Sequence, residues 1–129
     1  MYEIHGWMVI RESTKDIDAG GLPEIVAAIQ TLAKGFDQNP IVRLSVPNGM
    51  TTLNLTGMFN HADSRVDRVA TLVLDVCRLA PGSYGIFHIW DDEDVETANR
   101  FRVVVVRRGD VEIASDVFLS PCQPMIEDP

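Results

Sequence analysis

The sequence predicts an α+β domain in which two helices pack on a largely antiparallel sheet, in the order β-α-β-β-α-β-β-β. Three observations support this fold class: short segments that alternate apolar and polar residues, two longer segments with apolar residues at helical spacing, and short strands joined by turns that contain glycine. The chain has 129 residues, of which 46% are hydrophobic and 23% charged. Such a chain fits a single domain, residues 1–129, that can bury a core.

The first half of the chain contains a strand, a helix and a hairpin. Residues 2–12 alternate between an apolar side that includes Ile4 and Met8 and a second side that includes Trp7, which predicts a strand. Pro23 suits the first turn of a helix, and apolar residues follow it at helical spacing as far as position 36. The stretch 47–49, Pro-Asn-Gly, then predicts a hairpin built on a type I turn followed by a left-handed glycine.

A second helix begins near residue 64, and Asp63 or Ser64 can cap it. Its other face carries charged residues, and Pro81-Gly82 ends it. The predicted buried stripe consists of small and branched apolar residues: Val66, Val69, Ala70, Val73, Val76, Cys77 and Ala80.

The last third of the chain predicts three strands and an irregular tail. Residues 83–90 and 101–108 form two of the strands. The run from Val103 to Val106 is apolar on both faces, which predicts a central strand that is covered on both sides or covered by helices on one, with position 105 buried. Gly109-Asp110 predicts a two-residue hairpin turn into the last strand. We expect three apolar residues to pin down the proline-containing tail: Phe118, Leu119 and Ile126.

The charge of the chain narrows its possible partners. Its formal net charge is −8, and an acidic surface repels nucleic-acid backbones and anionic membranes, so neither is an expected partner. A basic protein is the favoured one. No apolar run approaches the roughly 20 residues of a membrane helix, and the first residues do not have the pattern of a signal peptide, so we expect a cytoplasmic protein. Cys77 and Cys122 do not form a C-x-x-C pair.

Five acids follow a tryptophan in the stretch "WDDEDVE" without an intervening lysine or arginine. Such crowding costs free energy unless water, a metal or a positively charged partner offsets it. The run lacks the spacing of a calcium-binding loop. Although most charge runs are solvated loops, this one follows an aromatic residue on a predicted loop of an acidic chain, which favours a partner-binding site. The predicted site comprises Trp90, Asp91, Asp92, Glu93, Asp94 and Glu96.

The familiar signatures of catalysis are missing from the sequence. It contains neither a phosphate-binding loop nor a G-x-S-x-G motif, and no histidine has a second one at ligand spacing. We therefore expect no catalytic residue, no metal and no cofactor. A rival hypothesis is a small metal- or carboxylate-dependent hydrolase using Asp91, Asp92 or Asp94 with His88, which would need a cleft holding these carboxylates. A third hypothesis is a ligand-binding homodimer with a large exposed apolar patch, and the oligomeric state is left open.

Four segments together resemble one protein family: "YEIHGWMVIRES", "GSYGIFHIWDDED", "NRFRVVVVRRG" and "FLSPCQPMIEDP". The chain resembles, over nearly its whole length, the seventh predicted immunity-protein family of bacterial polymorphic toxin systems. It departs from the expected pattern at Trp90, where another aromatic residue would precede the acids. The resemblance implies an α+β inhibitor without catalytic residues. Such an inhibitor binds and neutralises a cognate toxin, often a basic nuclease, that is encoded beside it.

Overall fold

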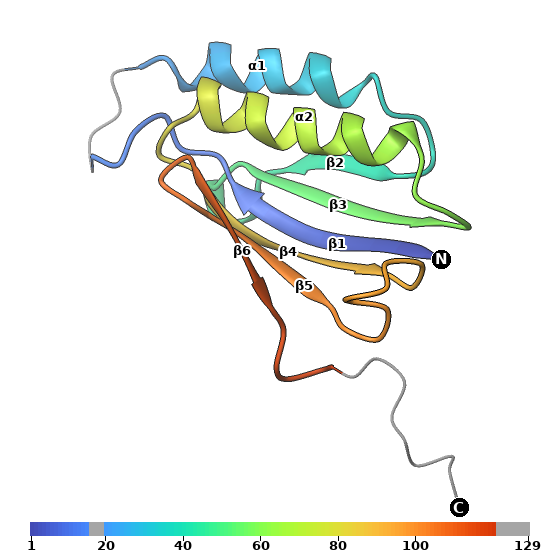
Figure 1. Ribbon diagram of the computed structural model, residues 1–129. Coiled ribbons are helices and arrows are strands. Elements are labelled where there is room, and N and C mark those ends of the chain that lie inside the picture. The colour runs from blue at the N-terminus through green and yellow to red at the C-terminus, as the bar shows by residue number, and fades with distance from the viewer. Residues whose placement is uncertain (16–19, 121–129) are drawn as a thin grey trace, which may run out of the picture.

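The computed structural model describes residues 1–15 and 20–120, and within them two helices lie side by side over one face of a six-stranded antiparallel sheet (Figure 1). The sheet has the order β2-β3-β1-β4-β5-β6. Both the fold class and the predicted order of elements are confirmed. The bounds are β1 Tyr2–Val9, α1 Leu22–Ala33, β2 Ile41–Ser45, β3 Thr52–Phe59, α2 Ser64–Leu79, β4 Tyr84–Asp91, β5 Arg102–Arg107 and β6 Asp110–Ser115.

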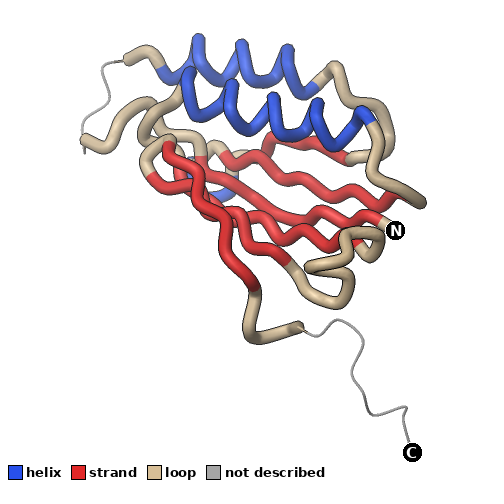
Figure 2. The backbone as a smooth tube through the Cα atoms, in the orientation of Figure 1, coloured by secondary structure: helices blue, strands red, loops and turns tan. Residues whose placement is uncertain are grey.

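Strand β1 lies at the centre of the sheet and pairs with β3 on one side and β4 on the other over all eight of its residues. Its alternation sends Ile4 and Met8 to the face that the helices cover, where both are almost fully buried. Gly6 lies on the same face and leaves room for the ring of Phe87, since a Cβ atom at Gly6 would approach that ring to 2.3 Å. The core therefore forms between the helices and this one face of the sheet (Figure 2).

Helix α2 is capped as predicted, but its buried stripe is rotated slightly. The Asp63 side chain accepts a hydrogen bond from the backbone N–H of Arg65 at 2.8 Å. Leu72 is buried, whereas Ala70 is exposed, so the prediction of Ala70 as a core residue is wrong. Leu72 lines a depression together with α1 residues such as Leu32, whereas Ala70 lines an open groove between α2 and the strands β5 and β6. Packing of α2 against α1 as well as the sheet accounts for the difference.

The first hairpin turn differs from the predicted type. Asn48 and Gly49 both have positive φ, at 51° and 76°, and the backbone N–H of Met50 donates to the Pro47 carbonyl at 3.0 Å. These are the marks of a two-residue type I′ turn, whereas the sequence prediction had only the glycine left-handed. A type I′ turn matches the right-handed twist of the paired strands, and Asn-Gly is its preferred sequence.

The second hairpin turn lies one residue earlier than predicted. Arg108 and Gly109 are its two central residues, with φ of 51° and 77°, and Arg107 pairs with Asp110. Asp110 therefore begins β6 instead of occupying the turn. The twist of the hairpin again requires two left-handed residues, and the pairing register places Arg108 at the first of them.

Strand β5 is next to the edge strand and not central, which corrects the prediction for residues 101–108. Val104 and Val106 face the helices, and Val106 is only 2% exposed. Val103 and Val105 lie on the other face and are half-buried. A valine run that is apolar on both faces therefore does not require burial on both faces, because here one face carries no described helix.

Residues 116–120, which follow β6, are held by polar contacts and not by their apolar side chains. Phe118 is 95% exposed and Leu119 66% exposed, so their predicted anchoring role is wrong, and Ile126 lies outside the described residues. The buried Asp116 carboxylate accepts hydrogen bonds from the backbone N–H groups of Phe118, Leu119 and Ser120. Burial by itself raises the pKa of the Asp116 carboxyl. Together, these hydrogen bonds lower the pKa by more than burial raises it, so it lies below its ordinary value.

Cys77 is buried on α2, as predicted, and burial raises the pKa of its thiol. A buried thiol of raised pKa is mostly protonated and unreactive at neutral pH, so Cys77 acts as a small apolar core residue. Cys122 lies outside the described residues.

We expect Val106→Asp to lower the free energy of unfolding by at least about 3 kcal/mol, because it would bury an unpaired charge beneath the helices. Val105→Asp is the matched control: it adds the same charge one residue away, on the half-buried opposite face. Urea unfolding followed by circular dichroism measures both variants. Equal losses would show that β5 is buried alike on its two faces.

We expect Asp116 to contribute acid-sensitive stability. Because its pKa is lower in the folded protein, this contribution is complete above the unfolded-state pKa of about 3.9 and is lost as the pH falls through the folded-state value. The difference in unfolding free energy between the wild type and Asp116→Asn should therefore be largest near neutral pH and shrink in acid. A difference that stays constant from neutral to strongly acidic pH would contradict this assignment.

Candidate functional site

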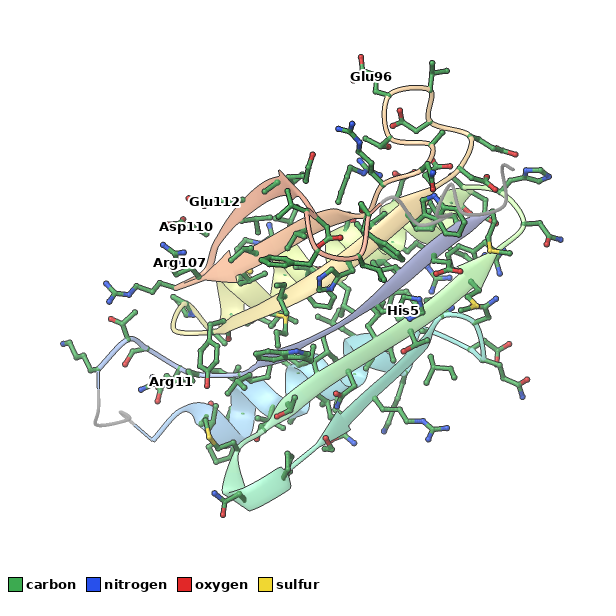
Figure 3. All side chains as sticks on the ribbon, turned by 90° about the horizontal axis from the view of Figure 1, so that it is seen from below. His5, Arg11, Glu96, Arg107, Asp110 and Glu112 are labelled. Carbon is green, nitrogen blue, oxygen red and sulfur yellow. The ribbon has the colours of Figure 1, made fainter. Side chains whose placement is uncertain are left out.

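The acidic run lies at the end of β4 and in the loop that follows it. Trp90 and Asp91 are the last residues of the strand, and the remaining acids lead into the connection to β5. This loop lies at the end of the sheet where the chain begins (Figure 1), and Glu96 lies far out along it (Figure 3). We define residues 91–96 as the acidic loop.

Two acids of this loop shape its backbone. The Asp91 Oδ1 atom accepts a hydrogen bond from the Glu93 N–H at 3.1 Å, and the Asp94 Oδ1 atom accepts one from the Glu96 N–H at 3.0 Å. Side chains of aspartate commonly form such turns by binding the backbone two residues further on. The loop also closes through backbone bonds from Asp94 to Asp91 and from Thr97 to Asp94. Asp91 and Asp94 therefore hold the other acids in place.

Two further acids meet positive or ionisable groups of the same chain. The Asp92 carboxylate binds the N-terminal ammonium of Met1, and the Glu93 carboxylate contacts the His61 imidazole. The hydrogen bond to Asp92 raises the pKa of the ammonium, although burial opposes this shift. The Asp92 and Glu93 side chains are nevertheless 41% and 51% exposed. Exposed ion pairs exchange readily with water and other ions, so these carboxylates can be reached by a partner.

Trp90 supports the loop from inside the fold. Its Nε1–H donates to the carbonyl of Ala98 at 2.8 Å, and its ring lies 6.1 Å from the ring of Phe101. The side chain is half-buried. Trp90 thus links the end of β4 to the segment that leads from the acidic loop into β5, and only part of its ring faces solvent.

The sheet face opposite the helices carries an apolar patch that the sequence analysis did not single out. The register aligns Trp7 on β1 with Ile86 on β4, and Ile86 with Val105 on β5. Tyr84 lies two residues before Ile86 on β4 and therefore on the same face. Its ring is 6.2 Å from that of Trp7 and nearly perpendicular to it. Trp7 is 41% exposed and Tyr84 37% exposed. We call this surface, formed by Trp7, Tyr84, Ile86, Val103 and Val105, the open face.

Two histidines face each other beside this patch. His5 on β1 pairs with His88 on β4, and His5 lies near the middle of the sheet in Figure 3. The His5 Nε2 atom is 3.2 Å from a carboxylate oxygen of Glu3. His88 shares the strand face of Trp90, and its ring packs edge-on against Phe101 at 6.3 Å. Within residues 1–15 and 20–120, no three histidine, cysteine or acidic side chains gather to hold a metal ion.

An apolar groove of about 310 Å³ lies on the helix side, between α2 and the strands β5 and β6. Leu74 and Ile113 are exposed at this groove, and Arg102 is the charged residue that lines it. The groove contains neither a carboxylate nor a histidine among its lining residues. This groove therefore does not provide the carboxylate cleft that the hydrolase hypothesis requires.

A small α+β domain with an exposed acidic loop and an uncovered apolar sheet face has the features of a protein-binding domain. The chain belongs to the Immunity protein 7 family, whose family model matches residues 1–128. The resemblance predicted from the sequence is thereby confirmed, and membership of an immunity-protein family implies a toxin as the partner. No curated protein and no solved structure matches the chain.

In the part of the chain that the structure describes, no helix is both long and apolar enough to cross a bilayer.

We expect neither a chelator nor millimolar calcium to change the thermal unfolding midpoint. Asp91 and Asp94 bind backbone amides, and Asp92 and Glu93 bind groups of the same chain, so the carboxylates are not directed at one common point. Differential scanning calorimetry with and without each addition tests this. A midpoint that rises with calcium would instead identify the acidic loop as a cation site, because a ligand bound only to the folded state stabilises it.

Proposed function

We propose that this chain is a non-catalytic immunity protein that neutralises a basic cognate toxin through its acidic loop. The observation that carries the proposal is the exposure of Asp92, Glu93 and Glu96 on a preformed loop at the end of the sheet. The residues we assign to the contact are those predicted from the sequence: Trp90, Asp91, Asp92, Glu93, Asp94 and Glu96.

The charge of the chain supports a nuclease as the toxin class. An enzyme that holds a nucleic-acid backbone needs lysines and arginines at its substrate site. The acidic loop has the complementary charge. The net charge of the chain, −8, has the same sign, so the rest of the molecule also attracts a basic toxin. Nucleic acid is the substrate that such a toxin meets in the cytoplasm, which we propose as the compartment of the encounter.

The internal ion pairs of the loop fit this role. Before binding, the Met1 ammonium and the His61 side chain offset part of the charge of Asp92 and Glu93. These contacts are exposed and contribute little to stability, so basic side chains of the toxin can replace them at small cost. Screening at physiological ionic strength limits the attraction to roughly 8 Å, and the association rate should therefore fall as salt is added.

The test is to remove three exposed charges without altering the loop, in the variant Asp92→Asn/Glu93→Gln/Glu96→Gln. Asp91 and Asp94 stay unchanged, so the turns that they form are retained. We expect association with the toxin domain encoded by the adjacent gene to slow by about 10-fold or more at low salt, and protection of toxin-expressing cells to be lost. Stopped-flow or biosensor kinetics over a salt series measures the rate.

The matched control is Glu24→Gln/Asp37→Asn/Asp67→Asn, which removes the same charge from exposed positions on or next to the helices. It should slow association much less. Equal slowing in both variants would assign the effect to overall charge, and unchanged kinetics in the loop variant would show that the loop is only solvated. Circular dichroism confirms that both variants fold.

A further inference from the structure

The open face presents aromatic side chains whose position the fold alone does not explain. Strand alternation places Trp7 and Tyr84 on the side of the sheet opposite the core. The described helices leave that side uncovered (Figure 2). Tryptophan and tyrosine are the residues most enriched among the energetically dominant contacts of protein interfaces. The two rings also contact each other, which limits their motion before a partner arrives.

Strand β4 connects this face directly to the acidic loop. Its alternate residues Tyr84, Ile86, His88 and Trp90 share one side of the sheet, and Asp92 follows in the loop. Eight residues of antiparallel strand span about 27 Å. A standard interface covers about 800 Å² on each partner, which corresponds to a patch about 28 Å on a side. One partner of ordinary footprint can therefore cover both Tyr84 and Asp92.

The charges around the open face favour a basic occupant. Glu3 lies beside Trp90 in the register, and Glu112 lies opposite Val105 on β6. Arg107 lies opposite Tyr84 in the register, but Asp110 lies opposite Arg107 on β6, and Arg43 lies on the edge strand β2. A second copy of this chain would bring another net charge of −8 to the same surface, and that repulsion opposes association.

We propose that the open face, centred on Trp7 and Tyr84, is the high-affinity part of the toxin-binding surface, and that an apolar projection of the toxin rimmed by lysine or arginine occupies it. This inference rests on the proposed function, and it assigns the association rate and the dissociation rate to different parts of the surface. The acidic loop accelerates the encounter, and burial of the two rings slows dissociation. Because both rings stand on the central strands β1 and β4, which pair over eight residues, the surface is rigid before binding and little ordering is needed.

The kinetic test compares Trp7→Ala and Tyr84→Ala with the wild type, using the toxin domain encoded by the adjacent gene. We expect each variant to dissociate at least roughly 30-fold faster, while the association rate stays within about threefold and keeps its salt dependence. Leu74→Ala and Ile113→Ala are the controls, since these side chains are 52% and 67% exposed at the groove on the other side of the sheet. Both should bind like the wild type.

A second measurement observes the open face with Trp7 and Tyr84 both unchanged. The chain contains two tryptophans, so 5-fluorotryptophan labelling gives two ¹⁹F resonances, which Trp90→Phe assigns. On adding unlabelled toxin domain, the Trp7 resonance should shift and lose its solvent isotope effect. A Trp7 resonance that stays unchanged in the complex would overturn the proposal, as would wild-type dissociation rates for both alanine variants.

The outcomes separate this inference from the proposed function. If the wild-type protein does not bind the toxin domain, the proposed function fails and the inference with it. If the acidic-loop variant slows association but Trp7→Ala dissociates normally, only the inference fails. Sedimentation velocity tests the remaining case, in which the wild-type protein forms a dimer. If Trp7→Ala dissociates this dimer and leaves toxin binding unchanged, the open face binds a second copy and the inference is overturned.

Discussion

The pairing of β1 with both of its neighbours is the constraint on which the rest of this molecule depends. All eight residues of β1 have partners on β3 and on β4. Because side chains alternate across a sheet, a slip of one residue would exchange the core set for the solvent set. The same register that buries Ile4 and Met8 beneath the helices therefore presents Trp7 on the open face.

The acidic loop follows from the same geometry. Strand β4 runs antiparallel to β1, so its last residues arrive beside the start of the chain, where Asp92 meets the Met1 ammonium. Crowding of acids is then offset locally, by backbone N–H groups at Asp91 and Asp94 and by ionisable groups at Asp92 and Glu93. These contacts involve groups of the chain itself, and the carboxylates of Asp92 and Glu93 still reach solvent.

Local patterns predict much of this fold, and non-local pairing accounts for what they miss. Alternation and helical spacing predict the order of elements, and local sequence predicts a helix cap at Asp63 or Ser64, because these signals depend on neighbouring residues. The structure places the cap at Asp63. The position of β5 could not be inferred, since a run such as Val103–Val106 has the same pattern in a central strand and beside an edge. The acidic loop is a contiguous run and is visible in the sequence, whereas Trp7 and Tyr84 are far apart in sequence and meet only through the register.

The two parts of the proposed surface differ in how freely they can change. The acidic loop closes on itself through bonds between residues two or three apart, so Glu93 or Glu96 can be replaced without disturbing the sheet. Residues of the open face alternate with core residues on the same strands: Ile86 lies next to Phe87, which is buried against Gly6. Substitution there must keep the strand pairing intact, whereas loop substitutions alter charge alone. Electrostatic steering can thus be adjusted to a different basic partner while the rigid apolar platform and the fold are kept.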